Sequence, residues 1–268
     1  MKHPSVTILG AGAMGEVLAG GLLRAGWQPD DLLLVARREE RRREVEERTG
    51  VSTTLDPAGS VKGRTVVVIA VKPADVPTLV GQVEGTITSD QVVVSLAAGV
   101  PTSRFEEAFP GVPVVRVMPN TPAQIDRGIT ALCGGIHTDE RSLGMAESVL
   151  SAVGETIVLD EYLLDAVTAV SGTGPAYVFL LAEALTEAAI REGLPRHAAE
   201  RLVQHTMRGA GMLMTAVDES PESLRAQVTS PGGTTAAAMH VLEERGFRAL
   251  VEDAVRAAAR RSREMGEG

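Results

Sequence analysis

The sequence predicts an α/β domain with a doubly wound, mainly parallel sheet, followed by an all-helical domain. Two observations lead to this prediction. Short β-branched runs alternate with helical stretches in the first half of the chain, and this alternation is typical of parallel sheets with helices on both faces. After about Tyr162 no convincing strand follows, and long segments rich in Ala and Leu take over. We therefore expect one domain over residues 1–161 and a second over residues 162–268.

The expected strands are mostly continuous apolar runs, the pattern of strands buried on both faces of a sheet. They cover residues 6–9, 32–36, 65–71, 91–95, 114–118 and 128–133, and residues 156–160 are a candidate for an edge strand. Helices are expected over residues 163–171, 175–192, 195–218, 221–227 and in two stretches between 234 and 265. Pro175, Pro195 and Pro221 each fall where a first helical turn begins, a position that proline favours.

The composition excludes several classes of protein. With 44% hydrophobic residues the chain is globular, and a net charge of −9 with only 3% aromatic residues disfavours nucleic-acid binding. A single cysteine, Cys133, excludes an internal disulfide, and the scattered histidines show no metal-ligand spacing. The N-terminus has no signal-peptide layout, and no apolar run approaches the ~18 residues of a membrane span. We therefore expect a cytoplasmic protein with no metal and no membrane partner.

The first expected strand leads into a glycine-rich turn. Residues 10–15 read Gly10, Ala11, Gly12, Ala13, Met14 and Gly15, and a helical stretch follows. In this context the first glycine permits the tight turn, the second lets the backbone approach a pyrophosphate, and the third allows close helix–strand packing. The helix N-terminus then faces the phosphate charge. The pattern predicts a Rossmann-type domain that binds a nicotinamide dinucleotide, against the alternative of a structural turn without a ligand.

The second expected strand ends in Arg37 and Arg38. A site for NAD would place an acidic residue there to accept from the ribose hydroxyl, whereas arginine suits a 2′-phosphate through paired charged hydrogen bonds. The sequence therefore favours NADPH, with NADH possible. The alternative is that one or both arginines belong only to the charged helix that follows, which we interpret as a solvated face over residues 39–48.

Three further strand ends carry unusual residues, and ligands of open α/β sheets bind at such ends. The residues we expect to contact the cofactor there are Ala70, Val71, Lys72 and Pro73, then Ala97, Ala98 and Gly99, and finally Asn120. Lys72 is a possible catalytic acid, but ordering the turn or touching the ribose is the favoured role. Asn120 either binds the carboxamide or caps the following turn.

Two segments of the second half closely resemble the pyrroline-5-carboxylate reductase family. They are residues 165–177 and residues 224–235, the latter followed by the alanine-rich stretch 236–242. The Ala-Val-Lys-Pro, Ala-Ala-Gly-Val and Met-Pro-Asn-Thr-Pro turns match in order and spacing as well, so the resemblance covers nearly the full chain. It implies NADPH-linked reduction of 1-pyrroline-5-carboxylate to L-proline, and a helical domain that forms a homodimer, with larger assemblies of dimers possible.

The resemblance makes chemical sense of the loop that precedes residue 236. Its residues Ser230, Gly232, Gly233, Thr234 and Thr235 are our candidates for binding the substrate, a small ring that carries a carboxylate and an imine. Backbone amides of a glycine-rich loop and a helix N-terminus suit a carboxylate, and the Ser230 hydroxyl can add a donor. Thr235 resembles the threonine that hydrogen-bonds the ring nitrogen in the family. The alternative is ordinary helix capping by Ser and Thr.

The proton that the imine nitrogen gains has no evident donor in the sequence. Tyr177 is a candidate for this catalytic role, although packing or lining the pocket is the favoured role. We prefer a substrate that binds already protonated, with Thr235 as the catalytic residue that orients it. The cofactor then supplies the hydride, and the protein supplies orientation and electrostatics.

Other functions stay open at this point or are disfavoured. A hydroxyacid reductase of the same plan needs a lysine on a later helix, and no lysine follows Lys72. A reductase of another cyclic imine stays open, and so does a non-catalytic sensor of NADP(H), although a sensor needs no carboxylate pocket. Two departures from the family, at residues 56–57 and 64–65, leave the strength of the NADPH preference open.

Overall fold

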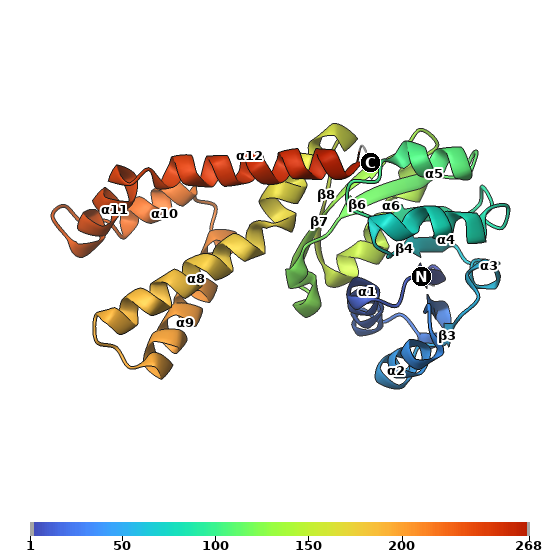
Figure 1. The fold of residues 1–268 in the computed structure, drawn as a ribbon, viewed down its shortest axis with the longest axis horizontal. Helices are drawn as coiled ribbons and strands as arrows, with labels where there is room; N and C mark the ends of the chain where they lie inside the picture. Colours follow the sequence, from blue (N-terminus) through green and yellow to red (C-terminus); the bar gives the residue numbers. More distant parts are fainter. Residues whose placement is uncertain (1–2, 267–268) are drawn as a thin grey trace. The chain divides into compact units, whose positions relative to one another are not determined.

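The computed structural model describes residues 3–266, which form two compact units (Figure 1). The first comprises the chain up to Gly172 together with the segment that begins at Ala258, and the second is Thr173–Ala257. The boundary expected after residue 161 marks where strands give way to helices, because β8 is the last strand of the described chain. Three short helical turns follow it before the first unit ends at Gly172.

The first unit is built on an eight-stranded sheet of order β3-β2-β1-β4-β5-β6-β7-β8. Every neighbouring pair is parallel except β6 and β7. The strands are β1 (Val6–Leu9), β2 (Leu32–Val35), β3 (Thr53–Thr54), β4 (Val66–Ile69), β5 (Val92–Ser95), β6 (Val114–Met118), β7 (Gly128–Gly134) and β8 (Gly154–Val158). This confirms the predicted fold class, and β8 is the edge strand for which the sequence offered a candidate. The two-residue strand β3 was not predicted.

Helices cover both faces of this sheet because side chains alternate along each strand. In β4, Val66 and Val68 point into one buried cluster, and Val67 and Ile69 point into the other. The first cluster contains residues of α1 (Ala13–Arg24), α2 (Glu39–Thr49) and α6 (Glu140–Leu150), and the second contains residues of α4 (Val76–Val83) and α5 (Thr102–Ala108). All four residues of β4 are fully buried, which explains why the strand reads as a continuous apolar run.

Shorter turns complete the first unit. They are α3 (Pro57–Ser60), α7 (Leu164–Val167), a π-helical turn at Thr168–Gly172 and five 3₁₀ turns at Pro29–Asp31, Pro73–Asp75, Thr121–Ile125, Ser151–Val153 and Glu161–Leu163. The last part of α12 (Phe247–Gly266) also belongs here. Its buried Ser262 donates a 2.6 Å hydrogen bond to Asp165 Oδ1, so the end of the chain is attached to the segment that follows the sheet.

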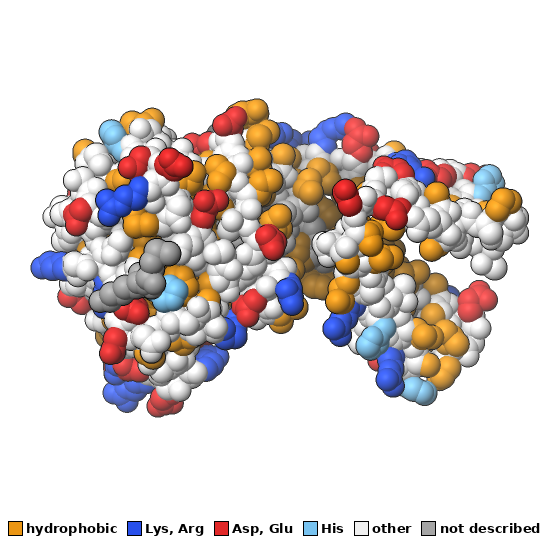
Figure 2. All heavy atoms as spheres, turned by 180° about the vertical axis from the view of Figure 1, so that it is seen from behind, with side chains coloured by type: hydrophobic (Ala, Val, Ile, Leu, Met, Phe, Trp, Pro, Cys, Tyr) orange, Lys and Arg blue, Asp and Glu red, His pale blue; other side chains and the backbone are white. Residues whose placement is uncertain are grey.

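The second unit is entirely helical, as predicted. It contains α8 (Gly174–Arg191), α9 (Arg196–Ala216), α10 (Pro221–Gln227), α11 (Thr234–Glu244) and the first part of α12. Helices α8 and α9 pack against each other, yet α8 has no buried residue. Large apolar side chains such as Phe179, Leu180 and Leu213 stay exposed, and Figure 2 shows hydrophobic side chains along these helices. A single copy therefore leaves much of the apolar surface of this unit uncovered.

One expectation about apolar segments was wrong. The helical stretch Glu161–Arg191 contains an 18-residue window with a mean hydropathy of 1.3, long and apolar enough by composition alone to cross a membrane. No uninterrupted apolar run marks this stretch in the sequence, because Thr, Ser, Gly and Glu183 are interspersed among Ala, Val and Leu. Such a helix is weak evidence for a membrane span, because the helices of soluble proteins can have the same composition.

Candidate nicotinamide dinucleotide site

The glycine turn of residues 10–15 joins β1 to α1, as predicted. Gly10 has φ +124°, and a Cβ there would lie 2.6 Å from the carbonyl oxygen of Ala70. A Cβ on Gly15 would collide with the Gly10 carbonyl. The amides of Gly10 and Ala11 both donate to the Val35 carbonyl, at 3.1 and 2.8 Å. These two glycines are therefore required by the fold itself, and the turn is attached to the end of β2.

Gly12 differs from Gly10 and Gly15, the other two glycines of this turn. Its φ is −84°, which any residue adopts, and a Cβ built on it would meet no atom within 4 Å among the described residues, apart from its immediate neighbours in the chain. The fold therefore gives no reason for glycine at this position. Close approach of a ligand gives one, because Gly12 is the N-cap of α1, where the first amides of the helix face outward. The turn thus fits the pyrophosphate of a dinucleotide on an observation independent of the sequence pattern.

Arginines surround this turn on the α2 side. Arg37 is 76% exposed and pairs with Asp75 at 2.9 Å (Nη1 to Oδ2). Arg38 is exposed at the N-cap of α2. Both stand where a 2′-phosphate contact was predicted, at the carboxyl end of β2. Since Asp75 already pairs with Arg37, a phosphate that binds this arginine must compete with a carboxylate.

Arg41 was not predicted as a site residue. Its Nε donates to the Ala11 carbonyl at 2.9 Å, and its Nη2 lies 3.0 Å from Glu16 Oε1. The pKa of Arg41 is raised, mainly by its hydrogen bond with Glu44. Arg48 also pairs with Glu16, at 3.0 Å. Two guanidinium groups, those of Arg41 and Arg48, therefore neutralise the Glu16 carboxylate that α1 carries beside the glycine turn. The sequence shows Arg41 only as one charge in a dense run, so no local signal distinguishes it.

The other predicted cofactor residues follow β4, β5 and β6 in the sheet. Because β1, β4, β5 and β6 are neighbours and parallel, the turns after them lie along one edge. Ala70 donates to the Leu9 carbonyl at 2.9 Å, and Lys72 is exposed. The structure thus brings the glycine turn, residues 70–73 and residues 97–99 to the same edge. Their contacts with a cofactor stay a prediction.

Asn120 uses both ends of its amide within the first unit. Its Oδ1 accepts from the Ile129 amide at 3.0 Å, and its Nδ2 donates to Ser171 Oγ at 3.2 Å. It is the N-cap of the 3₁₀ turn Thr121–Ile125 but makes no side-chain capping bond to it. Neither predicted role is thus visible in its contacts. The side chain connects the strand pair β6–β7 to the π-helical turn before α8.

The loop of residues 230–235 lies in the second unit and leads into α11. Gly233 is the N-cap of α11, no side chain caps the helix, and Gly232 has φ +67°. The Gly233 amide donates to the Ser230 carbonyl at 3.0 Å. Helix capping by Ser and Thr, the alternative interpretation, is therefore not what the hydroxyls of this loop do. Thr235 and Tyr177 are both half-buried in this unit, and the catalytic roles assigned to them stay predictions.

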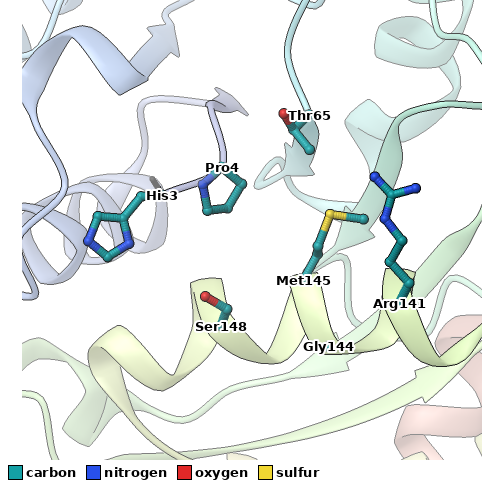
Figure 3. A pocket seen from close by; sticks show the side chains of 7 residues that line it. All are labelled: His3, Pro4, Thr65, Arg141, Gly144, Met145 and Ser148. Carbon is teal, nitrogen blue, oxygen red and sulfur yellow. The ribbon is translucent and has the colours of Figure 1, made fainter. Parts of the chain in front are cut away.

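A pocket elsewhere on the first unit does not belong to this edge. It has a volume of about 450 Å³ and is lined by His3, Pro4, Thr65, Arg141, Gly144, Met145 and Ser148 (Figure 3). Residues 3–4 and 65 precede β1 and β4, so the pocket lies at the amino ends of the strands, opposite the glycine turn. Among residues 3–266, no group of His, Cys, Asp and Glu is arranged to hold a metal ion.

The doubly wound sheet, the glycine turn and the appended helical unit define a nicotinamide-dependent oxidoreductase of two parts. Residues 161–265 match the family described as "Pyrroline-5-carboxylate reductase dimerisation", and residues 5–99 match "NADP oxidoreductase coenzyme F420-dependent". A pyrroline-5-carboxylate reductase of Corynebacterium melassecola is 39% identical, over 98% of this chain and 99% of its own. The chain therefore belongs to the pyrroline-5-carboxylate reductase family, which confirms the resemblance noted in the sequence.

Solved structures agree with this assignment. A pyrroline-5-carboxylate reductase from Coxiella burnetii has a TM-score of 0.93 and 35% identity, with 98% of each chain covered. A pyrroline carboxylate reductase from Plasmodium falciparum, solved with NADP bound, has a TM-score of 0.88 and 27% identity, with 99% of each chain covered. The similarity therefore extends through both units and is not confined to the dinucleotide-binding domain.

Proposed function

We propose that this chain reduces 1-pyrroline-5-carboxylate to L-proline with NADPH as the preferred hydride donor. Family membership over nearly the full length supports the reaction. The preference for NADPH over NADH is supported by Arg37 and Arg38 at the end of β2, because residues 36–38, directly after the strand, include no acidic side chain. The NADP-bound relative supports the same cofactor class.

The observation that carries the substrate assignment is the 230–235 loop. The first amides of α11, an 11-residue helix, have no side-chain cap, and unpaired N–H groups with a helix dipole favour an anion. A carboxylate on a small ring fits this position. Ser230, Gly232, Gly233 and Thr234 bind the carboxylate in this proposal, while Thr235 on the first turn of α11 orients the ring nitrogen.

The chemistry follows from that orientation. Bound NADPH supplies a hydride to the imine carbon, and the ring nitrogen ends protonated. We propose that the substrate binds already as the iminium, so that its N–H group donates a hydrogen bond to the Thr235 hydroxyl and no acidic side chain is required. Tyr177 then lines the pocket. Lys72, exposed at the turn after β4, contacts the ribose and donates no proton to the substrate.

We further propose a soluble, cytoplasmic homodimer formed through the helical unit, with larger assemblies of dimers possible. The exposed side chains of Val178, Phe179, Leu180 and Leu181 on α8 support this, because they need an apolar cover. The match to a dimerisation family over residues 161–265 supports a second copy as that cover. Burial against a second copy also accounts for the high mean hydropathy of Glu161–Arg191 without a membrane span.

Paired variants of Thr235 test the site. Thr235→Ala is expected to lower kcat/KM for pyrroline-5-carboxylate by about tenfold or more, the cost of a lost hydrogen bond to a charged group, while the Kd for NADPH stays unchanged. Thr235→Ser keeps the hydroxyl and should recover most of the activity. Wild-type turnover by Thr235→Ala would refute the role of this residue. An absence of turnover in the unaltered protein, with NADPH still bound, would favour the sensor alternative.

A further inference from the structure

Glu161 lies at the centre of a half-buried cluster that the proposed mechanism does not use. Its Oε1 accepts from the Thr102 amide at 2.8 Å, and its Oε2 accepts from the Thr102 hydroxyl at 2.9 Å. Arg116 Nη1 donates to Oε1 at 3.2 Å. Thr102 and Arg116 are 5% and 8% exposed. We call these three residues the Glu161 cluster, and all of them belong to the first unit.

The cluster supplies what the sequence around α5 lacks. Helix α5 begins at Thr102 after Pro101, which is its N-cap and offers no side-chain acceptor. The first amide of a helix has no partner inside the helix, so a carboxylate brought from a residue far along the chain replaces a local cap. Arg116 from β6 neutralises that carboxylate, because a buried guanidinium needs a charged partner.

Thr102 ends the segment that carries the 97–99 turn, defined by Ala97, Ala98 and Gly99. On the strand side of this turn, the Ala97 amide donates to Ser95 Oγ at 3.3 Å. Gly99 has φ +78°, and a Cβ on it would lie 3.2 Å from the amide nitrogen of Gly266. The turn is thus held by β5 at one end, by the end of α12 at its tip and by Glu161 at its exit.

We infer that Glu161 is a positioning residue for hydride transfer, because it fixes the exit of the 97–99 turn on which the nicotinamide half of the cofactor rests. This inference rests on the proposed function and on residues 97–99, predicted above to contact the cofactor, as the turn that receives its nicotinamide half. Hydride transfer is sensitive to small displacements, and a misplacement of about 1 Å can cost about a hundredfold in rate. The adenosine half rests on the glycine turn and on Arg37, where Glu161 makes no contact.

The experiment compares Glu161→Ala and Thr102→Val with a matched control, Glu155→Gln, which alters an exposed carboxylate of β8. For each purified full-length variant we would measure the Kd of NADPH, the fluorescence of the bound nicotinamide, the steady-state kcat and the deuterium isotope effect with 4-deuterated NADPH. Thr102→Val keeps the Arg116–Glu161 pair and removes only one hydroxyl, so it is the variant that keeps the fold intact.

We expect Glu161→Ala to lower kcat by about tenfold or more and to weaken the fluorescence of the bound nicotinamide, with the Kd for NADPH changed less than about threefold. Thr102→Val should lower kcat by about threefold, the effect of one lost hydrogen bond, and Thr102→Ser should restore it. The isotope effect should rise in both variants as hydride transfer becomes slower.

Two results would overturn the inference. One is wild-type kcat and wild-type nicotinamide fluorescence in both variants. The other is a loss of NADPH affinity equal to the loss of kcat, which would show a general structural role. Failure of the proposed function is distinguishable, because it appears as no turnover in the unaltered protein, while the fluorescence comparison still reports the order of the nicotinamide.

Discussion

The Arg37–Asp75 ion pair gives a quantitative prediction about cofactor choice. The two side chains are 76% and 33% exposed and 2.9 Å apart. An ion pair of this exposure contributes about 0.2–1 kcal/mol. A 2′-phosphate that binds Arg37 must break this ion pair, which lowers the binding free energy of NADPH by that amount. Asp75→Asn removes the pair, so it should improve NADPH binding by about 1.4- to 5-fold, since 1.4 kcal/mol corresponds to a factor of ten. NADH carries no 2′-phosphate, and its binding should not improve.

The assay is kcat/KM for NADPH and for NADH, measured for the unaltered protein, Asp75→Asn, Arg37→Ala and the double variant. Arg37→Ala should reduce the NADPH-to-NADH ratio by about tenfold, because a charged hydrogen bond to phosphate is worth about 1.5–3 kcal/mol before solvent screening. In the Arg37→Ala background, Asp75→Asn should bring little further gain. The reasoning is refuted if Asp75→Asn leaves the ratio unchanged, or raises it equally with and without Arg37.

Three further predictions follow from the first unit. Gly12→Ala should fold normally and lose about tenfold or more in NADPH affinity, since a methyl group forced against a ligand costs about 1–3 kcal/mol; Gly15→Ala should instead lower the melting temperature, and the reverse pattern would contradict the roles given to these glycines. Burial, with the charge of Glu161 adding to it, raises the pKa of the Cys133 thiol to about 12, so iodoacetamide should label it at about pH 8 only on unfolding; rapid labelling of the folded protein would oppose this. The Arg24 hydrogen bond holds the pKa of Asp126 below its usual range, so this pair stabilises the fold above the unfolded pKa of about 3.9, and that stabilisation is lost as the pH falls through the folded pKa. Asp126→Asn should therefore lose less stability on acidification in denaturant titrations, and an unchanged dependence of stability on pH would argue against the pair.

All strands except β3 were predictable, because each of them carries its own signal in the sequence. β4 is three valines and an isoleucine, β5 is three valines and Ser95, and all of these residues are buried, so the sequence and the environment of both strands agree. β3 has only Thr53 and Thr54, and it exists because it pairs with Leu34 and Val35 of β2. No local pattern contains that information, since a two-residue strand is defined by its partner.

The candidate site also contains residues that the sequence revealed and residues that it did not. The glycine turn was recognised because its residue types and its strand–turn–helix context are contiguous in sequence. Arg41 and Glu161 were missed because their roles depend on distant partners, the Ala11 carbonyl and Thr102. A charged residue in a mixed-charge helix looks solvated until the packing of that helix is known. The sequence singled out Asn120, but it could not show the hydrogen bond to Ser171, because that partner lies 51 residues away.

The most direct test of the proposed function is a parallel assay of the purified chain with 1-pyrroline-5-carboxylate and either NADPH or NADH, in which L-proline is quantified. We expect one proline for each NADPH oxidised and a higher kcat/KM with NADPH than with NADH. Demonstrable NADPH binding without proline formation would contradict the assignment of the reaction. Equal or better turnover with NADH would contradict the role given to the arginines at the end of β2.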